Sequence, residues 1–353
     1  MLRNSTKRIF VGGVPIGGGA PVTVQSMTNT RTQDALATSE QIRRLEDAGC
    51  DIVRVAVPNR EAAEAIRELK KTARIPIVAD IHFDHTLALA ALEAGADKIR
   101  INPGNIGGPD RVMAVALAAK ARGVPIRIGV NGGSVPREAL LEYGGPTPEA
   151  LAETALREIA LLEQFDFTDI CVAVKSSDAA DTYEANRLLA EKCEYPLHLG
   201  VTEAGTSFAG TIRSSVGIGA LLMGGIGDTI RVSLTADPVL EVRTGIEILK
   251  AAGLRRGGLR IISCPSCGRC GIDLIGTAAE VEERLQGVTR DITVAVMGCE
   301  VNGPGEARGA DYGLAGGQNG GGVLFKYGEV VGRAPAQGLA DALVEMVLAE
   351  NPA

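Results

Sequence analysis

The segment IPIVADIHFDHTLALAALEAGADKIRIN, residues 75–102, holds one complete unit of the pattern from which the fold is predicted. It opens with a β-branched apolar run (Ile75–Ile81), continues with an Ala- and Leu-rich helical pattern (Thr86–Ala94) and closes with a second apolar run (Lys98–Ile101). Short apolar strands that alternate with helices of this length are typical of βαβ units, whose strands are parallel. The segment therefore predicts two neighbouring parallel strands joined by a helix.

The same alternation runs through the first two thirds of the chain. Eight strands and eight helices in about 250 residues match a (β/α)8 TIM barrel better than an open doubly wound sheet. No Gly-x-Gly-x-x-Gly follows the first strand, which disfavours a dinucleotide-binding domain. The predicted strands are 21–27, 52–57, 75–81, 98–101, 126–130, 170–174, 197–201 and 229–234, and the predicted helices are 39–48, 60–71, 86–94, 111–122, 148–163, 180–192, 209–223 and 239–252.

The composition turns to Gly and Arg at Gly253–Leu259, which indicates a linker. We therefore expect a barrel domain over residues 1–254 and a second domain over residues 260–353. A helix (277–285), strands (292–296, 322–327 and 329–332) and a closing helix (338–349) predict that the second domain is a small α+β unit.

Composition limits the classes of partner. The 353 residues carry a net charge of −7, whereas binding to nucleic acid requires a basic surface. No run of 18 apolar residues occurs, so no membrane-spanning helix is expected. The N-terminal residues Met1–Lys7 are polar and lack an apolar signal segment, which predicts a cytoplasmic protein.

Four of the seven cysteines fall in two short runs, Cys264-Pro-Ser-Cys267-Gly-Arg-Cys270 and Gly298-Cys299, the latter followed by Glu-Val-Asn-Gly-Pro-Gly-Glu306. Cys-x-x-Cys spacing with a distant third cysteine is typical of a metal or cluster site. Three ligand sets stay open from spacing alone: a zinc held by four cysteines, an iron–sulfur cluster held by the same four, or a cluster in which Glu306 replaces Cys270. The spacing favours iron–sulfur over zinc, and a disulfide is disfavoured because the chain is not a short, loop-rich secreted protein. The other three cysteines, Cys50, Cys171 and Cys193, lie in apolar runs and are expected in the core.

Charged and polar side chains recur at the ends of the predicted barrel strands, where TIM-barrel active sites form. Five of them are cations, which predicts a positively charged mouth that binds a small polyanion such as a diphosphate. Glu203 is a candidate proton donor to a leaving oxygen, and Asp80 lies two residues from His82, so both share a face. Ser26 is a further candidate for a phosphate or hydroxyl contact. The candidate binding residues are Arg54, Asp80, His82, Arg100, Asn102, Arg127, Asn131, Lys175, Arg231 and Ser233.

Several motifs resemble the 4-hydroxy-3-methylbut-2-enyl diphosphate synthase (GcpE/IspG) family in its two-domain bacterial form. The resemblance covers nearly the whole chain, and the two cysteine motifs together are highly specific. The motifs are VQSMTNT (24–30), ADIHF (79–83), KIRINPGN (98–105), SCPSCGR (263–269) and GC…NGPGE (298–306).

The resemblance implies a [4Fe–4S] cluster held by Cys264, Cys267, Cys299 and Glu306, with Cys270 outside the ligand set. It also implies the two-electron reductive ring opening of 2-C-methyl-D-erythritol 2,4-cyclodiphosphate in the non-mevalonate (MEP) isoprenoid pathway, with Glu203 and Glu306 as catalytic residues. The expected partners are flavodoxin or ferredoxin as electron donor and a second copy of the chain, in a homodimer whose active sites are shared. Two alternatives are an aconitase-like hydro-lyase acting on a phosphorylated substrate and a zinc-stabilised binding module.

Overall fold

A computed structural model of the chain describes residues 5–299, 309–317 and 320–352. The chain divides into two compact units, Met1–Arg255 and Arg256–Ala353. No helix of the described residues is long and apolar enough to cross a membrane.

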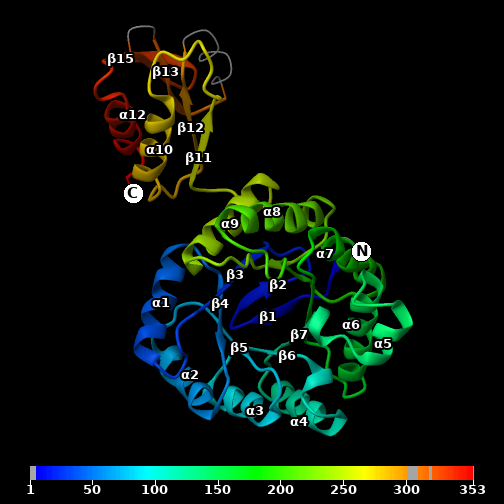
Figure 1. Ribbon diagram of the computed structural model, residues 1–353. Helices are drawn as coiled ribbons and strands as arrows, with labels where there is room; N and C mark the ends of the chain where they lie inside the picture. The colour runs from blue at the N-terminus through cyan, green and yellow to red at the C-terminus, as the bar shows by residue number, and fades with distance from the viewer. Residues whose placement is uncertain (1–4, 300–308, 318–319, 353) are drawn as a thin grey trace. The chain divides into compact units, whose positions relative to one another are not determined.

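The first unit is a barrel of parallel strands with helices around its outside (Figure 1). The strands follow the order β8-β7-β6-β5-β4-β3-β10-β9, and a bridge between Val172 and Leu197 closes the ring. The predicted TIM barrel is confirmed. Its strands are β3 (Thr23–Met27), β4 (Ile52–Ala56), β5 (Ile77–Asp80), β6 (Lys98–Ile101), β7 (Ile126–Asn131), β8 (Ile170–Lys175), β9 (His198–Leu199) and β10 (Thr229–Ile230).

Side-chain caps fix where most of the outer helices begin. Asn59 accepts a hydrogen bond from the Ala62 amide, so α2 begins at Arg60 as predicted. Asp34 caps the Ala37 amide, and α1 therefore begins at Ala35 rather than at Ser39. The outer helices are α1 (Ala35–Asp47), α2 (Arg60–Thr72), α3 (His85–Ala94), α4 (Pro109–Lys120), α6 (Pro148–Glu163), α7 (Ala179–Lys192), α8 (Ser207–Met223) and α9 (Pro238–Ala251). The short helix α5 (Arg137–Tyr143) and the 3₁₀ turns η2 (Pro103–Asn105) and η3 (Gly132–Ser134) were not predicted.

An N-terminal hairpin covers the end of the barrel at which the strands begin. Its strands β1 (Ile9–Val11) and β2 (Val14–Ile16) pair antiparallel. Ile9, Val11 and Ile16 form one apolar cluster with residues at or near the starts of the barrel strands, among them Ile52 and Cys171. Since this end is filled with apolar side chains, the polar side chains at the opposite strand ends are the candidates for a site.

The second unit is a five-stranded mixed sheet with the order β11-β12-β13-β14-β15. Its elements are β11 (Leu259–Ser263), α10 (Leu274–Arg284), β12 (Ile292–Met297), β13 (Tyr312–Gly316), β14 (Gly322–Lys326), β15 (Glu329–Ala334) and α12 (Leu339–Leu348). The strands β11, β12 and β13 are parallel, and the last two pairs are antiparallel. Strand β13 was not predicted because its sequence YGLAG is rich in glycine and alanine, which are weak strand formers.

Candidate active site

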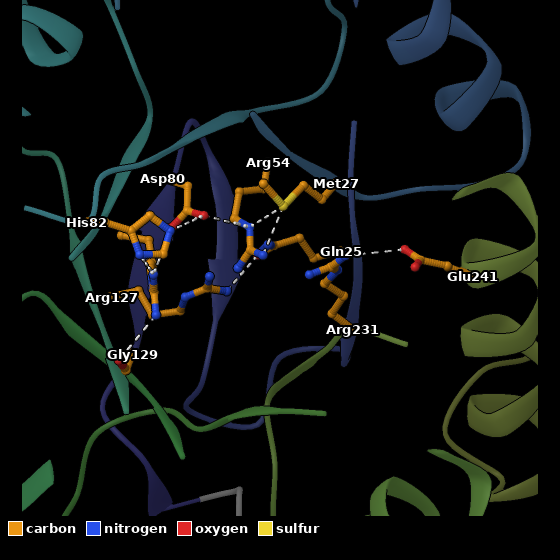
Figure 2. Close-up of polar contacts among 10 residues, drawn as sticks. Gln25, Met27, Arg54, Asp80, His82, Arg127, Gly129, Arg231 and Glu241 are labelled. Carbon is orange, nitrogen blue, oxygen red and sulfur yellow. Dashed lines mark hydrogen bonds and ion pairs between the residues drawn. The ribbon is translucent and has the colours of Figure 1, made fainter. Parts of the chain in front are cut away.

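A cavity of about 180 Å³ opens where the barrel strands end. It holds the predicted binding residues Arg54, Asp80, His82, Arg100, Arg127, Asn131, Lys175, Arg231 and Ser233, and its other lining residues are Gly129, Val130, Ala173 and Thr202. The side chains come from β4, β5, β6, β7 and β8 and from the segments that follow β5, β9 and β10, and they meet because the parallel strands end at the same end of the barrel. Figure 2 shows several of them pointing toward one another.

Asp80, the last residue of β5, is the one acid among the described residues that line this cavity. Its Oδ1 accepts a hydrogen bond from Arg100 Nη1 at 3.1 Å, and its Oδ2 lies 3.8 Å from Arg54 Nε. His82 Nε2 lies 3.4 Å from the same Oδ2 (Figure 2). Burial alone favours the neutral acid, but Arg54, the hydrogen bond from His82, and Arg100 together hold the pKa of Asp80 well below its usual value. Asp80 is therefore an anion that orients two arginines and a histidine.

The other cations are packed closely with little compensating negative charge. Arg127 is 1% exposed and donates from Nη1 to Gln25 Oε1 at 3.0 Å, which is a neutral partner. Burial, followed by repulsion from Arg100, lowers the pKa of Arg127 to about 10. Burial and the neighbouring arginines lower the pKa of Lys175 well below its ordinary value. A site in which cations repel one another in a desolvated place has a strong affinity for an anion.

Two glycines leave room for these cations. A Cβ on Gly129 would lie 2.4 Å from Arg100 Nε, and the Gly129 carbonyl accepts from Arg100 Nη2 at 3.2 Å. A Cβ on Gly200 would lie 2.5 Å from the Arg231 carbonyl oxygen and 2.7 Å from Lys175 Nζ. Any larger residue at either position would displace the cation.

Three candidates from the sequence lie outside the lining of this cavity. Asn102 is buried, and its Oδ1 accepts from the Gly104 amide at 3.1 Å, so it caps η2. Glu203 is exposed in the loop after β9 and has a φ of 52°, a left-handed conformation that few residues other than glycine adopt. Ser26 is buried and donates to Glu241 Oε2 at 3.1 Å.

Sequence reasoning missed the residues behind the cavity. Gln25 shares the inward face of β3 with Met27, and the alternation of strand faces could have found it. Met27 Sδ accepts from Arg54 Nε at 3.0 Å and from Nη2 at 2.9 Å. Glu241 lies on a helix, so no strand-end pattern could have found it.

The cysteine motifs of the second unit follow adjacent parallel strands. Cys264 comes directly after β11 and Cys299 comes two residues after the end of β12, and these strands pair with Ser263 opposite Val296. Cys264 Sγ accepts from the Gly298 amide at 3.3 Å. The backbone and then the side chain of Arg269 lower the pKa of the exposed Cys267, although partial desolvation opposes them. Cys270 Sγ instead donates to the Ile272 carbonyl at 3.2 Å.

The chemistry of these thiols fits the ligation of an iron–sulfur cluster. A lowered thiol pKa favours the thiolate that binds iron, and both loops leave the same edge of the sheet. Within the described residues, no group of three or more His, Cys, Asp or Glu side chains is placed to hold a metal ion. Glu306 lies outside the described residues. The thiols of Cys50, Cys171 and Cys193 are buried as predicted, and none of the seven cysteines is in a disulfide.

Comparison with known proteins decides between the open alternatives. The GcpE TIM-barrel domain matches residues 6–246, and the GcpE protein C-terminal domain matches residues 260–349. The chain belongs to the GcpE family. The predicted family is thereby confirmed, and with it an iron–sulfur oxidoreductase with a [4Fe–4S] cofactor; the zinc alternative is set aside.

Relatives of this GcpE-family chain match it over nearly their whole length. A protein of Geobacter sulfurreducens is 56% identical over 99% of this chain and 100% of its own, and one of Symbiobacterium thermophilum is 58% identical over 98% and 93%. Both are named 4-hydroxy-3-methylbut-2-en-1-yl diphosphate synthase (flavodoxin). These names support the predicted synthase and not the hydro-lyase.

Solved structures share the barrel. Dihydropteroate synthase of Yersinia pestis covers 70% of this chain and 98% of its own with a TM-score of 0.53 and 14% identity. Type I 3-dehydroquinate dehydratase of Clostridium difficile covers 71% and 98% with a TM-score of 0.50 and 17% identity. At these identities the likeness shows the fold alone.

Proposed function

We propose that this chain opens the ring of 2-C-methyl-D-erythritol 2,4-cyclodiphosphate reductively to form (E)-4-hydroxy-3-methylbut-2-enyl diphosphate, using electrons from flavodoxin. The chain is a GcpE-family synthase of the MEP isoprenoid pathway, and the relatives' names specify flavodoxin. The observation that carries the site-level proposal is the set of five cations around one carboxylate at the barrel mouth. A cytoplasmic location stays a prediction.

The barrel unit would bind the substrate. Guanidinium groups of Arg54, Arg100, Arg127 and Arg231 match phosphate oxygens, and Asp80 already orients the first two of them. Asn131 and Ser233 line the same cavity and would bind the remaining phosphate or hydroxyl oxygens. Because these groups are held in place before the ligand arrives, little ordering cost is left for binding.

The second unit would hold the cluster through Cys264, Cys267, Cys299 and Glu306. When bound, a [4Fe–4S] cluster supplies electrons and a Lewis-acidic iron. His82 is polarised by Asp80 at the cavity wall and would orient the diphosphate or hold a proton beside it. Glu203, on the exposed loop after β9, would give a proton to the departing hydroxyl. Asn102 would hold the loop after β6 through its hydrogen bond with the Gly104 amide and would not contact the substrate directly.

The test is anaerobic purification, metal and sulfide analysis and a reductive assay. About four irons and four sulfides per chain, a brown protein and turnover of the cyclic diphosphate with reduced flavodoxin are expected. Arg54→Met is expected to lower kcat/KM by about a hundredfold while the iron content stays unchanged, because charge-assisted contacts to phosphate are lost. A fully loaded protein that does not consume the cyclic diphosphate with any reductant contradicts the proposal.

A homodimer with shared active sites is the second part of the proposal. The predicted binding side chains lie in the first unit and the cluster thiols in the second. In the proposed dimer, each site would combine one copy's barrel with its partner's cluster. Mixing Arg54→Met chains with Cys299→Ser chains tests this arrangement. Activity restored in verified heterodimers is the expected result, and inactive heterodimers contradict it.

A further inference from the structure

The segment after β10 carries two lining residues of the cavity but has little strand structure of its own. Strand β10 ends at Ile230, whereas Arg231 and Ser233 come after it. The Arg231 amide still donates to the Leu199 carbonyl at 2.9 Å. The residues just beyond Arg231 therefore lie outside the strand ladder of the barrel.

Thr235 is held by its amide, which donates to the Gly205 carbonyl at 2.9 Å. Glu241, in the first turn of α9, supplies a side-chain contact to the residues between Arg231 and Thr235. Its Oε1 accepts from the Leu234 amide at 2.9 Å, and its Oε2 accepts from Ser26 Oγ at 3.1 Å. The same Oε2 lies 3.7 Å from Arg231 Nη2 (Figure 2). One carboxylate thus joins the end of β3, the segment after β10 and an arginine of the cavity.

The buried Glu241 carboxylate needs its hydrogen-bond donors and its neighbouring cation to offset the free-energy cost of burial. The Glu241 side chain is 5% exposed, and a buried carboxylate is unfavourable unless donors satisfy it. Two hydrogen bonds, one cation and the positive end of α9 provide that compensation. Arg231 Nε has no hydrogen-bond partner, and Glu241 is the one acid paired with this guanidinium among the described residues.

We propose that Glu241 is a positioning residue that holds Arg231 and Ser233 in the geometry for binding the substrate's diphosphate. This inference rests on the proposed function, because Arg231 matters only if the cavity binds that ligand. Glu241 does not line the cavity and acts through Arg231 and the backbone of Leu234.

Glu241→Gln tests the role with little change in shape. The amide oxygen can still accept from the Leu234 amide, and the amide nitrogen can donate to the Ser26 hydroxyl. The amide nitrogen cannot accept a hydrogen bond from Arg231, so the favourable contact with the guanidinium is lost. We expect KM for the cyclic diphosphate to rise about tenfold and kcat to change less than about twofold, as for the loss of one charge-assisted contact. Ser26→Ala, which removes one anchor of the carboxylate, should raise KM about twofold to threefold in a folded protein.

A double-mutant cycle with Arg231→Met separates positioning from general stabilisation. If Glu241 acts through Arg231, adding Glu241→Gln to Arg231→Met leaves KM at the value of the single Arg231 variant. Glu46→Gln is the matched control, since Glu46 is also 5% exposed and paired with an arginine, Arg74, but lies away from the cavity. This control should lower the melting temperature and leave KM unchanged.

Three results overturn the inference in distinguishable ways. Additive effects of the two substitutions on KM mean that Glu241 does not act through Arg231. An unchanged KM in both Glu241→Gln and Ser26→Ala means that Glu241 only stabilises the fold. An unchanged KM in Arg231→Met itself contradicts the proposed binding role of Arg231 and this inference with it.

Discussion

The barrel mouth and the cysteine loops are both built where parallel strands end, but they differ in whether strands or loops carry the functional side chains. At the mouth, Arg54 and Arg100 lie on strands and contact Asp80, the last residue of a third strand. In the second unit, Cys264 and Cys299 lie in the loops that follow two adjacent strands, not on the strands themselves. Side chains on strands are fixed by the backbone ladder, whereas donors on loops need the bound group itself to bring them together.

The largest effect that tests this comparison is expected from Cys299→Ser. Loss of one proposed ligand should remove most of the cluster iron and lower activity by a factor on the order of 10³ or more. Binding of the cyclic diphosphate should persist, because the mouth is formed by the other unit. Iron and sulfide analysis after anaerobic reconstitution, together with calorimetry of ligand binding, measures both.

Cys270→Ser is the matched control for this variant. Its thiol donates to the Ile272 carbonyl, a contact that a serine hydroxyl can replace. We expect wild-type iron content, with activity within about threefold. Iron lost equally from both variants would mean that Cys270 is a ligand, and diphosphate binding lost from Cys299→Ser would mean that the two regions depend on each other.

The same difference explains how far the sequence alone could go. Alternating strand faces place Asp80 with His82 and Arg127 with Asn131, and the structure brings these four side chains into one cavity. The pattern could not reveal Glu241, because its role depends on how α9 packs against β3. Nor could it show that Asn102 turns toward Gly104, because a short-range cap competes with the strand-face rule.

Gly129 tests how closely the side chains of the barrel mouth are packed. In Gly129→Ala the new methyl group would lie 2.4 Å from Arg100 Nε, so Arg100 would have to leave Asp80. We expect KM for the cyclic diphosphate to rise about tenfold to a hundredfold. Gly219→Ala on α8 is the control, since no atom lies within 4 Å of its added Cβ, and it should stabilise the protein by about 0.5–1 kcal/mol without changing KM. An unchanged KM in Gly129→Ala would show that Arg100 can move aside without loss of substrate binding, so that its position on the strand is not fixed.

A smaller effect is expected from the protonation of Lys175, the lining cation whose ammonium group has no hydrogen bond or ion pair among the described residues. Burial and the surrounding arginines lower its pKa, and a bound dianion must raise it again. The complex therefore holds more protons than the free protein. As the pH rises from the pKa of Lys175 in the free protein to its pKa in the complex, the affinity for the cyclic diphosphate should fall by up to about tenfold per pH unit.

Calorimetry of cyclic-diphosphate binding in two buffers with different ionisation enthalpies measures this uptake. Lys175→Arg keeps the charge and should bind with no pH dependence over this window. Lys98→Met is the control, because burial lowers the pKa of Lys98 to about 8 but Lys98 does not line the cavity. Proton uptake that survives in Lys175→Arg and disappears in Lys98→Met would assign the proton to Lys98 instead.

The smallest effect concerns Glu158, a buried carboxyl on α6 that accepts from the Gly104 amide at 3.3 Å beside Asn102. Burial raises its pKa to about 8, although Gly104 and Arg100 oppose the shift. The folded chain therefore holds a proton that the unfolded chain has lost, so the free energy of unfolding should decrease as the pH rises from about 4.5 to about 8. Glu158→Gln keeps the acceptor and cannot ionise, so its melting temperature should match the wild type near pH 5 and exceed it by on the order of 10 °C near pH 8.5. Glu153→Gln on the same helix, where Arg157 pairs with the carboxylate, should show no such pH-dependent gain. If the melting temperatures of the wild type and Glu158→Gln depend on pH in the same way, the Glu158 carboxyl ionises in the folded chain as it does in the unfolded chain.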